Sequence, residues 1–294
     1  IVLNEEIEAE GARPFVCDMG LRVDDAHLSA QRAGILGARH HAPSRLPGRL
    51  PIPAMRDSLG TIVHFIDQKS DTHRVWDIEF AATPVQPLPQ PAGLRRVDHM
   101  AQIMPGDEMD SLMLYYLSTF GLLKRTQVGM QDPAGMVASQ ALETPEGDVR
   151  IALNGVDGAQ DAPASTSVQH VALQTDDIFE TAAVLASNGF AALPVPSAYY
   201  HDLAQRFELE DGLLAALQQA NALYDRSSAG GEFFQVYSLP LSSGLFFEIV
   251  QRKGGYSGYG AANSPVRRTA LAALSDRPTA LPASRHSQKA ENHV

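Results

Sequence analysis

The sequence is poor in cysteine, tryptophan and basic side chains, and it has no long apolar run. Its single cysteine, Cys17, has no partner for an internal disulfide, so we expect a reducing, cytoplasmic compartment. With 23 Lys and Arg against 34 Asp and Glu, the net charge of −11 argues against a nucleic-acid or anionic-membrane partner. No apolar stretch reaches the length of a membrane span. The 294 residues, 44% of them hydrophobic, suffice for two globular domains.

One stretch near the end of the chain places a carboxylate among apolar residues. Within Gly244–Asn263 the segment FFEIVQ alternates as a strand does, and Glu248 shares a face with Phe246 and Val250. An unpaired buried charge is costly. We therefore expect Glu248 to be protonated, ion-paired or bound to a cation.

Two other predicted strands each carry one histidine among small or apolar neighbours. These are His99 in RVDHMAQI and His170 in VQHVALQT. Either histidine alone is typical of a hydrogen-bonded core residue. Together with Glu248 they make the two-histidine, one-carboxylate set that holds iron(II) on one side and leaves the other positions open.

An internal repeat divides the chain into two similar α+β modules. The pairs that recur at a constant offset of 152 positions are Leu21 and Leu173, Asp25 and Asp177, and Gly37 and Gly189. In the second copy the aspartate has the spacing of a helix N-cap, and the glycine has the position that ends a helix. Repetition of this kind predicts two modules of the same fold.

Composition sets the expected boundaries. We predict a first module at 1–80, a proline-rich linker at 81–94, a second module at 95–275 and a disordered tail at 276–294. The opening letters IVLN look like a strand already under way. We therefore expect a fragment of a longer protein, with the first module truncated at its N-terminus.

The apolar periodicity predicts the elements within these modules. Helices are expected over 26–36, 110–120 and 178–188, the second with Leu114 and Tyr115 facing inward. The other expected elements are strands at 1–4, 15–23, 96–103, 136–142, 148–153 and 168–175, a polar loop at 154–167, an insertion at 197–225 with a helical run at 213–223, and a hairpin of 231–239 with 245–251.

The first module has its own polar pair at the corresponding positions. Because of the repeat, Asp18 matches His170 and His64 matches Glu248. No third ligand is visible in the sequence nearby, so we interpret this pair as a relic and not as a second metal site. We expect His40 and His41, which are neighbours in the sequence, to be solvated in a loop. We expect the two histidines of the tail, at 286 and 293, to be solvated as well.

These motifs resemble the vicinal-oxygen-chelate superfamily, and within it the 4-hydroxyphenylpyruvate dioxygenase family. The resemblance covers residues 15–274, through VCDMGLRVDDA, LPIPAMRDSLG, VDHM, VQHVALQTDDI, FFQV, FFEIVQRKGG and GYGAAN. The segment YYHDLAQRFELEDGLLAAL, with LYDRSSAGGEFFQV, is similar to the dioxygenase-like C-terminal half of bacterial fused 3-dehydroshikimate dehydratases. The fold this implies is α+β, with two tandem βαβββ-type modules built on curved mixed or antiparallel sheets.

The resemblance implies roles for particular residues. His99, His170 and Glu248 would be the metal ligands, and Gln235 of FFQV would lie beside the open coordination positions. Asn263 of GYGAAN would belong to the closing C-terminal segment. Either Phe246 or Phe247 would pack on an aromatic substrate, although plain packing or local hydrogen bonding explains Gln235, Asn263 and the phenylalanines equally simply.

Two departures from the dioxygenase pattern bear on the substrate. The segment before the second histidine, NGVDGAQDAPASTS, lacks the Ser-Gln-Ile motif and the longer loop of that family. After Asn263 this chain has Ser264 and Pro265 where the family has phenylalanine, which predicts a weaker helical lid and a weaker aromatic wall. Metal binding is unaffected by either change.

The resemblance leaves three hypotheses for function. The first is a dioxygenase that uses iron(II), dioxygen and a small aromatic 2-oxo acid for oxidative decarboxylation and ring hydroxylation. The second is an accessory, metal-binding half of a dehydratase fusion in quinate or shikimate breakdown, with a dehydratase barrel as its partner in the same chain. The third is an enzyme of the superfamily with non-redox metal chemistry.

The cofactor and partners follow from these hypotheses. Iron(II) is the expected metal, although manganese, cobalt or magnesium would also suit such a site. We expect no dehydratase activity from this chain alone, because the barrel that carries it in the family is not in this sequence. A homo-oligomer is expected.

Overall fold

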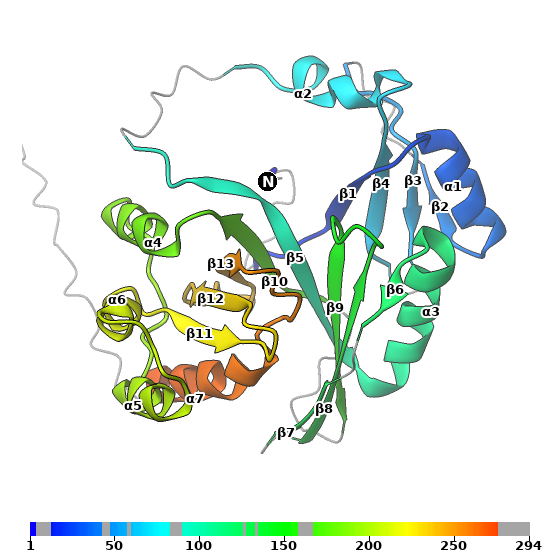
Figure 1. Cartoon of the computed structure of the whole chain (residues 1–294). Helices are drawn as coiled ribbons and strands as arrows, with labels where there is room; N and C mark the ends of the chain where they lie inside the picture. The colour runs from blue at the N-terminus through cyan, green and yellow to red at the C-terminus, as the bar shows by residue number, and fades with distance from the viewer. Residues whose placement is uncertain are drawn as a thin grey trace, which may run out of the picture.

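The chain folds into two β-sheets flanked by helices (Figure 1). The structure is a computed structural model that describes residues 1–3, 13–42, 48–57, 60–82, 90–125, 128–132, 135–157 and 167–275. Within these residues, one sheet has four strands and the other has nine. The larger sheet curls around its own face in Figure 1. This mixed architecture with curled sheets confirms the predicted fold class.

The smaller sheet is built from the first part of the chain. Its strand order is β1-β4-β3-β2, with β1 parallel to β4 and the other pairs antiparallel. The elements are β1 (Asp18–Arg22), α1 (Ala26–Ile35), β2 (Arg39–His41), β3 (Ala54–Arg56), β4 (Ile62–Ile66), the 3₁₀ helix η1 (Asp71–Arg74) and α2 (Val75–Ile78).

The larger sheet contains the same unit twice. The first unit is β5 (Leu94–Pro105), η2 (Gly106–Glu108), α3 (Met109–Phe120), β6 (Leu123–Lys124), β7 (Val128–Asp132), β8 (Gly135–Glu143) and β9 (Arg150–Asp157). The second is β10 (Ser167–Thr175), α4 (Ile178–Ser187), α5 (Ser197–Arg206), α6 (Leu213–Gln219), β11 (Leu223–Arg226), β12 (Glu232–Tyr237) and β13 (Phe246–Lys253), followed by η3 (Ala261–Asn263) and α7 (Ser264–Ser275).

The two units join at the centre of the larger sheet. The strand order is β11-β12-β13-β10-β5-β9-β8-β6, with β7 also paired to β8. Strand β10 runs antiparallel to β5, and each of these two strands is parallel to the last strand of its own unit, β13 or β9. The central strands therefore come from different units, which brings residues far apart in the sequence onto neighbouring strands.

The internal repeat is confirmed at the level of hydrogen bonds. The Asp25 side chain accepts from the Leu28 amide at 2.9 Å, and the Asp177 side chain accepts from the Phe179 and Glu180 amides at 2.9 and 3.0 Å. Both aspartates cap their helices as predicted. The glycines that follow, Gly37 and Gly189, have φ of +97° and +89°, a backbone region that favours glycine.

The strand registers show that the two modules share one frame. In the parallel pair β1–β4, Asp18 lies opposite Ile62 and Gly20 opposite His64. In the parallel pair β10–β13, the same places are taken by His170 opposite Phe246 and by Ala172 opposite Glu248. Asp18 and His64 therefore occupy the positions that His170 and Glu248 occupy in the larger sheet.

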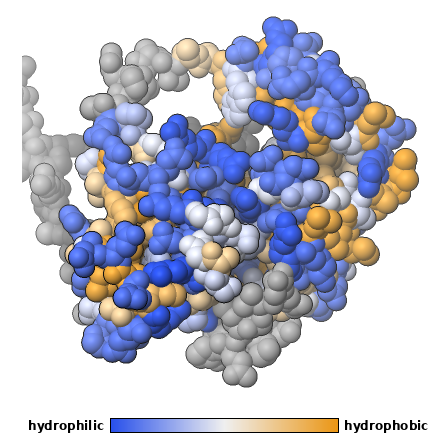
Figure 2. Space-filling model, viewed as in Figure 1, coloured by the Kyte–Doolittle hydropathy of each residue, from blue (hydrophilic) through white to orange (hydrophobic). Residues whose placement is uncertain are grey.

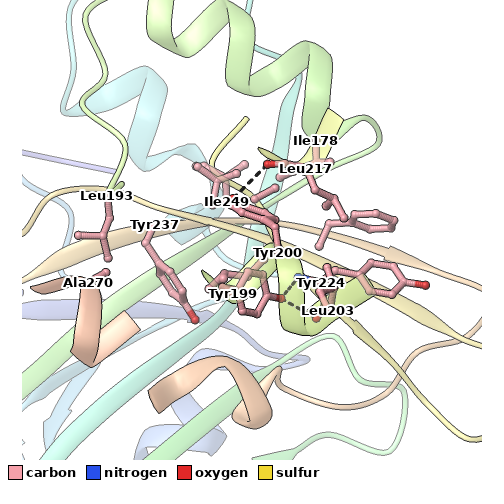
Figure 3. Packing of buried hydrophobic residues seen from close by; sticks show 14 of the residues in the cluster. Ile178, Leu193, Tyr199, Tyr200, Leu203, Leu217, Tyr224, Tyr237, Ile249 and Ala270 are labelled. Carbon is pink, nitrogen blue, oxygen red and sulfur yellow. Dashed lines mark hydrogen bonds between the residues drawn. The ribbon is translucent and has the colours of Figure 1, made fainter. Parts of the chain in front are cut away.

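The largest hydrophobic cluster packs helices α4 to α7 against strands β11 to β13 (Figure 3). Its polar atoms are satisfied internally: the Tyr199 hydroxyl donates to the Tyr224 carbonyl at 3.0 Å and accepts from the Tyr224 amide at 2.8 Å. Leu203 and Leu217 are fully buried beside these tyrosines. This cluster fixes α7 against the sheet, because Ala270 of α7 is part of it.

Helix α1 of the smaller sheet contacts α3 of the larger one. The Arg32 guanidinium donates to the Ser118 carbonyl at 3.0 Å, and the rings of Phe65 and Phe120 lie 6.0 Å apart. The outer side of α1 is apolar, with Ile35 79% exposed. Figure 2 shows hydrophobic surface at the edge where α1 lies, next to hydrophilic surface.

Helix α3 corrects one prediction about orientation. Leu114 was expected inward but is 65% exposed, whereas Leu112, Tyr115 and Tyr116 are buried. The buried positions follow the helical spacing of three and four residues, and Leu114 falls between them on the solvent side. The prediction for Tyr115 is confirmed.

Several predicted elements have different bounds. Ile1–Leu3 have no regular secondary structure, so the expected opening strand is wrong for them. His40 and His41 are in β2 and not in a loop, because that segment pairs with β3. Strand β9 runs to Asp157, so the loop predicted from 154 is shorter.

The predicted helical run at 213–223 stops early, and the helix that follows η3 is intact. Helix α6 ends at Gln219, and Asn221 has φ of +51°, a turn conformation that asparagine tolerates. Helix α7 begins at Ser264 despite Pro265, since proline is accepted in the first turn of a helix. The tail at 276–294 lies outside the described residues.

Two leucines on the same helix test the orientation of α3. We expect Leu112→Ala to lower the free energy of unfolding by about 2–5 kcal/mol, because the side chain is fully buried. Leu114→Ala is the matched control and should stay within about 0.5 kcal/mol of the wild type. Denaturant titration monitored by circular dichroism measures both, and equal losses in the two variants would contradict this orientation.

Candidate metal centre

The predicted ligands lie on three neighbouring strands at the centre of the larger sheet. His99 is on β5, His170 on β10 and Glu248 on β13. Ala172 of β10 lies opposite His99 on one side and opposite Glu248 on the other. His99, Ala172 and Glu248 thus form a row across the sheet, and the small side chain of Ala172 leaves room for those of His99 and Glu248 to converge. His170 precedes Ala172 by two residues and therefore points to the same face.

The three side chains converge on one point. The Nε2 atoms of His99 and His170 lie 3.3 Å apart, and the Glu248 Oε2 atom lies 3.4 Å from His99 Nε2 and 3.3 Å from His170 Nε2. Donor atoms about 2.1 Å from a metal lie about 3.0 Å apart at right angles and about 3.4 Å apart at tetrahedral angles. The set therefore fits a divalent cation. It is the one such group of three ligands among the residues that the structure describes.

A buried aspartate orients His99 from behind. Asp98 Oδ1 lies 2.8 Å from His99 Nδ1, so that nitrogen carries the proton and Nε2 is free to bind a metal. Arg252 donates to both carboxylate oxygens of Asp98 at 2.8 Å, and Arg150 lies 3.6 Å away. In many proteins a carboxylate bound in this way to the far nitrogen of a histidine fixes the ring for metal binding.

Sequence alternation missed Asp98 because of a β-bulge. Ala172 pairs with His99 and the next residue, Leu173, pairs with Val97, so Asp98 has no partner on β10. The extra residue lets two consecutive side chains reach the interior, a common role of bulges beside functional sites. The signal that was available in the sequence is the acidic residue itself, which stands directly before the histidine in VDHM.

Two amides orient the third ligand. Gln235 Nε2 donates to Glu248 Oε1 at 2.7 Å and to the Tyr237 hydroxyl at 2.9 Å. The Gln235 carbonyl oxygen accepts from Asn263 Nδ2 at 2.7 Å, and the Tyr199 hydroxyl lies 3.2 Å from Asn263 Oδ1. The structure thus brings Gln235 and Asn263 together with Glu248. The free oxygen of Glu248, Oε2, is the one that faces the histidines.

His170 has a different environment from His99. Its ring stacks on Phe246 with centroids 4.7 Å apart, and its Nδ1 atom has no hydrogen-bond partner among the described residues. Its side chain is 13% exposed, the most of the three ligands. Phe247, the other candidate for a substrate contact, points to the opposite face of β13, since adjacent side chains in a strand alternate.

The charges at the site depend on one another. Burial raises the pKa of Glu248, but His170 and His99 outweigh it, and the pKa lies well below its usual value. Burial lowers the pKa of His99, while Asp98 and Glu248 outweigh it and raise it overall. For His170 burial prevails and lowers the pKa, so this imidazole is neutral at pH 7. An ionised carboxylate and a neutral imidazole are the forms that bind metals.

The corresponding pair in the smaller sheet does not form a metal site of this kind. His64 Nε2 lies 3.7 Å from Asp18 Oδ2, and both side chains are partly exposed. No third ligand joins them in the part of the chain that the structure describes.

Comparison with known proteins agrees with the fold. A profile of the glyoxalase/bleomycin resistance protein/dioxygenase superfamily matches residues 96–217, which contain most of β5, the whole of β10 and the candidate ligands His99 and His170. Residues 96–217 belong to this superfamily.

Two curated relatives illustrate the homology. The 3-dehydroshikimate dehydratase of Pseudomonas putida is 37% identical over 287 residues, which are 92% of this chain and 45% of the relative. A 4-hydroxyphenylpyruvate dioxygenase of a Pseudomonas species is 29% identical over 263 residues, 85% of this chain and 73% of the relative. The chain thus spans less than half the length of the dehydratase.

Solved structures show the same architecture. A fusion of a xylose isomerase-like TIM barrel with a 4-hydroxyphenylpyruvate dioxygenase matches 88% of this chain and 41% of its own, with a TM-score of 0.75 and 35% identity. A mutant 4-hydroxymandelate synthase from Streptomyces coelicolor matches with a TM-score of 0.72 at 21% identity, covering 88% of this chain and 77% of its own, and shows the fold alone. Among the described residues, no helix is long and apolar enough to span a membrane.

Replacement of Asp98 tests the support of His99. We expect Asp98→Asn to weaken cobalt(II) binding by about 10- to 100-fold, because the neutral amide no longer fixes the His99 tautomer or balances Arg252. Asp148→Asn is the matched control, since Asp148 pairs with Arg96 at the surface. Isothermal titration calorimetry measures both affinities. His99→Ala is a second control and should abolish binding. If it does, and Asp98→Asn binds cobalt(II) as tightly as the wild type, the proposed role of Asp98 is disproved.

Proposed function

We propose that this chain is the dioxygenase-like, metal-binding half of a protein of the fused 3-dehydroshikimate dehydratase type. The observation that carries the proposal is a buried His99–His170–Glu248 triangle, with edges of 3.3 to 3.4 Å, in a chain 37% identical to such a dehydratase. The relative is about twice as long as the match, and the fusion in the solved structure pairs a barrel with a dioxygenase part. The function supported is divalent-metal binding beside a dehydratase barrel.

The residues around the site have defined tasks in this function. Asp98 holds the proton of His99 on Nδ1, and Gln235 holds one oxygen of Glu248, so both ligands present a fixed donor atom. Phe246 covers the ring of His170 and limits the access of water. Iron(II), when bound, would supply redox chemistry toward dioxygen, and manganese or cobalt would supply Lewis acidity instead.

A second candidate function is oxidation of an aromatic 2-oxo acid, as in 4-hydroxyphenylpyruvate dioxygenases. The observation in its favour is the complete ligand set with Gln235 bound to Glu248. Against it stand Ser264 in place of the family's phenylalanine and the short segment before His170. Both changes affect the substrate side of the site and leave the ligands intact.

Oxygen consumption separates the two candidates. We expect the chain, loaded anaerobically with iron(II) and given 4-hydroxyphenylpyruvate, to bind iron without taking up oxygen when air is admitted. An oxygen electrode and product analysis measure this, and His170→Ala serves as the metal-free control. Uptake that yields homogentisate and disappears in His170→Ala would establish the second candidate in place of the first.

Dehydratase activity provides an independent measurement. Neither sheet of the described residues is an eight-stranded parallel barrel, so we expect no conversion of 3-dehydroshikimate by this chain alone. Absorbance of the aromatic product would reveal such a conversion. If the purified chain converts 3-dehydroshikimate, and does so faster than the Glu248→Ala variant, the dehydratase activity would belong to this metal centre and the proposal would be overturned.

A further inference from the structure

An arginine beside the metal centre is held by no hydrogen bond or ion pair among the described residues, and its charge interacts with Glu248 from beyond ion-pair distance. Arg267 lies on α7, with its guanidinium carbon 4.3 Å from the Phe246 ring centroid and 5.8 Å from the Tyr237 centroid. In the described residues its guanidinium makes no hydrogen bond and no ion pair. The other arginine at the site, Arg252, is bound to Asp98 through two hydrogen bonds. A guanidinium carries five donors, and leaving all of them unpaired beside apolar groups is unfavourable.

The side chain of Arg267 lines a pocket. The pocket has a volume of about 430 Å³ and lies between α7 and the β12–β13 hairpin. Its walls are apolar except for one hydroxyl and the guanidinium; they consist of Leu193, Ser238, Pro240, Gly244, Phe246, Arg267, Leu271 and Leu274. The Ser238 hydroxyl is already engaged with the backbone, donating to the Leu239 carbonyl and accepting from the Phe247 amide, both at 2.9 Å. The guanidinium is therefore the group with free hydrogen-bonding capacity in this pocket.

The pocket adjoins the metal ligands through Phe246. The Phe246 ring touches the guanidinium on α7 and also stacks on the ring of His170, at centroid separations of 4.3 and 4.7 Å. The guanidinium carbon is therefore at most 9.0 Å from the His170 ring centroid, the sum of those two separations. Phe246 lines the pocket and also stacks on His170, whereas none of the three candidate ligands lines the pocket.

We propose that Arg267 binds the carboxylate of a small organic acid in this pocket, which the Phe246 ring separates from His170. This inference goes beyond the proposed function, because it assigns a ligand class to a second pocket beside the metal centre. A single guanidinium in an otherwise neutral, apolar pocket suits a carboxylate, which it binds through two parallel hydrogen bonds.

Ligand-observed fluorine NMR on the metal-free chain tests the proposal without using the metal. The probes are 4-fluorobenzoate and 4-fluorobenzamide, which have the same size and differ in the carboxylate. We expect the acid to bind at least tenfold more tightly than the amide in the wild type. We expect Arg267→Met to lower the affinity for the acid at least tenfold while affinity for the amide stays unchanged, and Arg267→Lys to restore part of it. Arg268→Met, the neighbouring arginine on α7, is the matched control and should bind both probes as the wild type does.

The outcomes are distinguishable from those of the proposed function. Equal affinity of the wild type for acid and amide, no binding of the acid, or an equal loss in the Arg268→Met variant would each overturn the role of Arg267. Circular dichroism melting confirms that the variants are folded before binding is compared. Because no metal is present, a chain that fails to bind iron still gives a decisive result for the arginine, and a failed arginine leaves metal binding to be judged by calorimetry.

Discussion

Burial of the Glu248 carboxylate is the constraint on which the centre of the structure depends. The side chain is 1% exposed on the middle strands of the larger sheet, where an unpaired charge would be unstable. One of its oxygens accepts a hydrogen bond from the amide of Gln235, and the other lies beside the two imidazoles. The same requirement extends outward, because His99 in turn needs Asp98, and Asp98 needs Arg252.

These partners are arranged by topology more than by local sequence. Strands β5 and β10 begin two copies of one folding unit and pair in antiparallel fashion, and this pairing brings His99 beside Ala172 and hence within reach of Glu248. The smaller sheet has the equivalent positions, filled by Asp18 and His64, but no neighbouring strand in the described residues completes a set there. The same frame thus holds three candidate metal ligands in one sheet and a partly exposed polar pair in the other.

Helix α7 connects this centre to the question of the ligand. It packs into the main hydrophobic cluster through Ala270 and presents Arg267 to the rings of Phe246 and Tyr237. The same Phe246 ring stacks on His170, so helix α7 and the candidate metal ligands contact a common side chain.

The sequence by itself determined the repeat, the fold class and a candidate set of three ligands, because each leaves a local mark: a constant offset, a cap before each helix, and a histidine or carboxylate inside an apolar strand. The family resemblance added Gln235 and Asn263 as further candidates, through the motifs that contain them. The bulge that aims Asp98 inward, the outward turn of Leu114 and the unpaired Arg267 were decided by tertiary structure. The physical reason is that strand alternation and helix spacing predict which side chains share a face, but not which face meets the rest of the protein. Asp98 depends on a register shift between β5 and β10, and Leu114 on how α3 packs against its sheet. Arg267 depends on which side chains surround it in space.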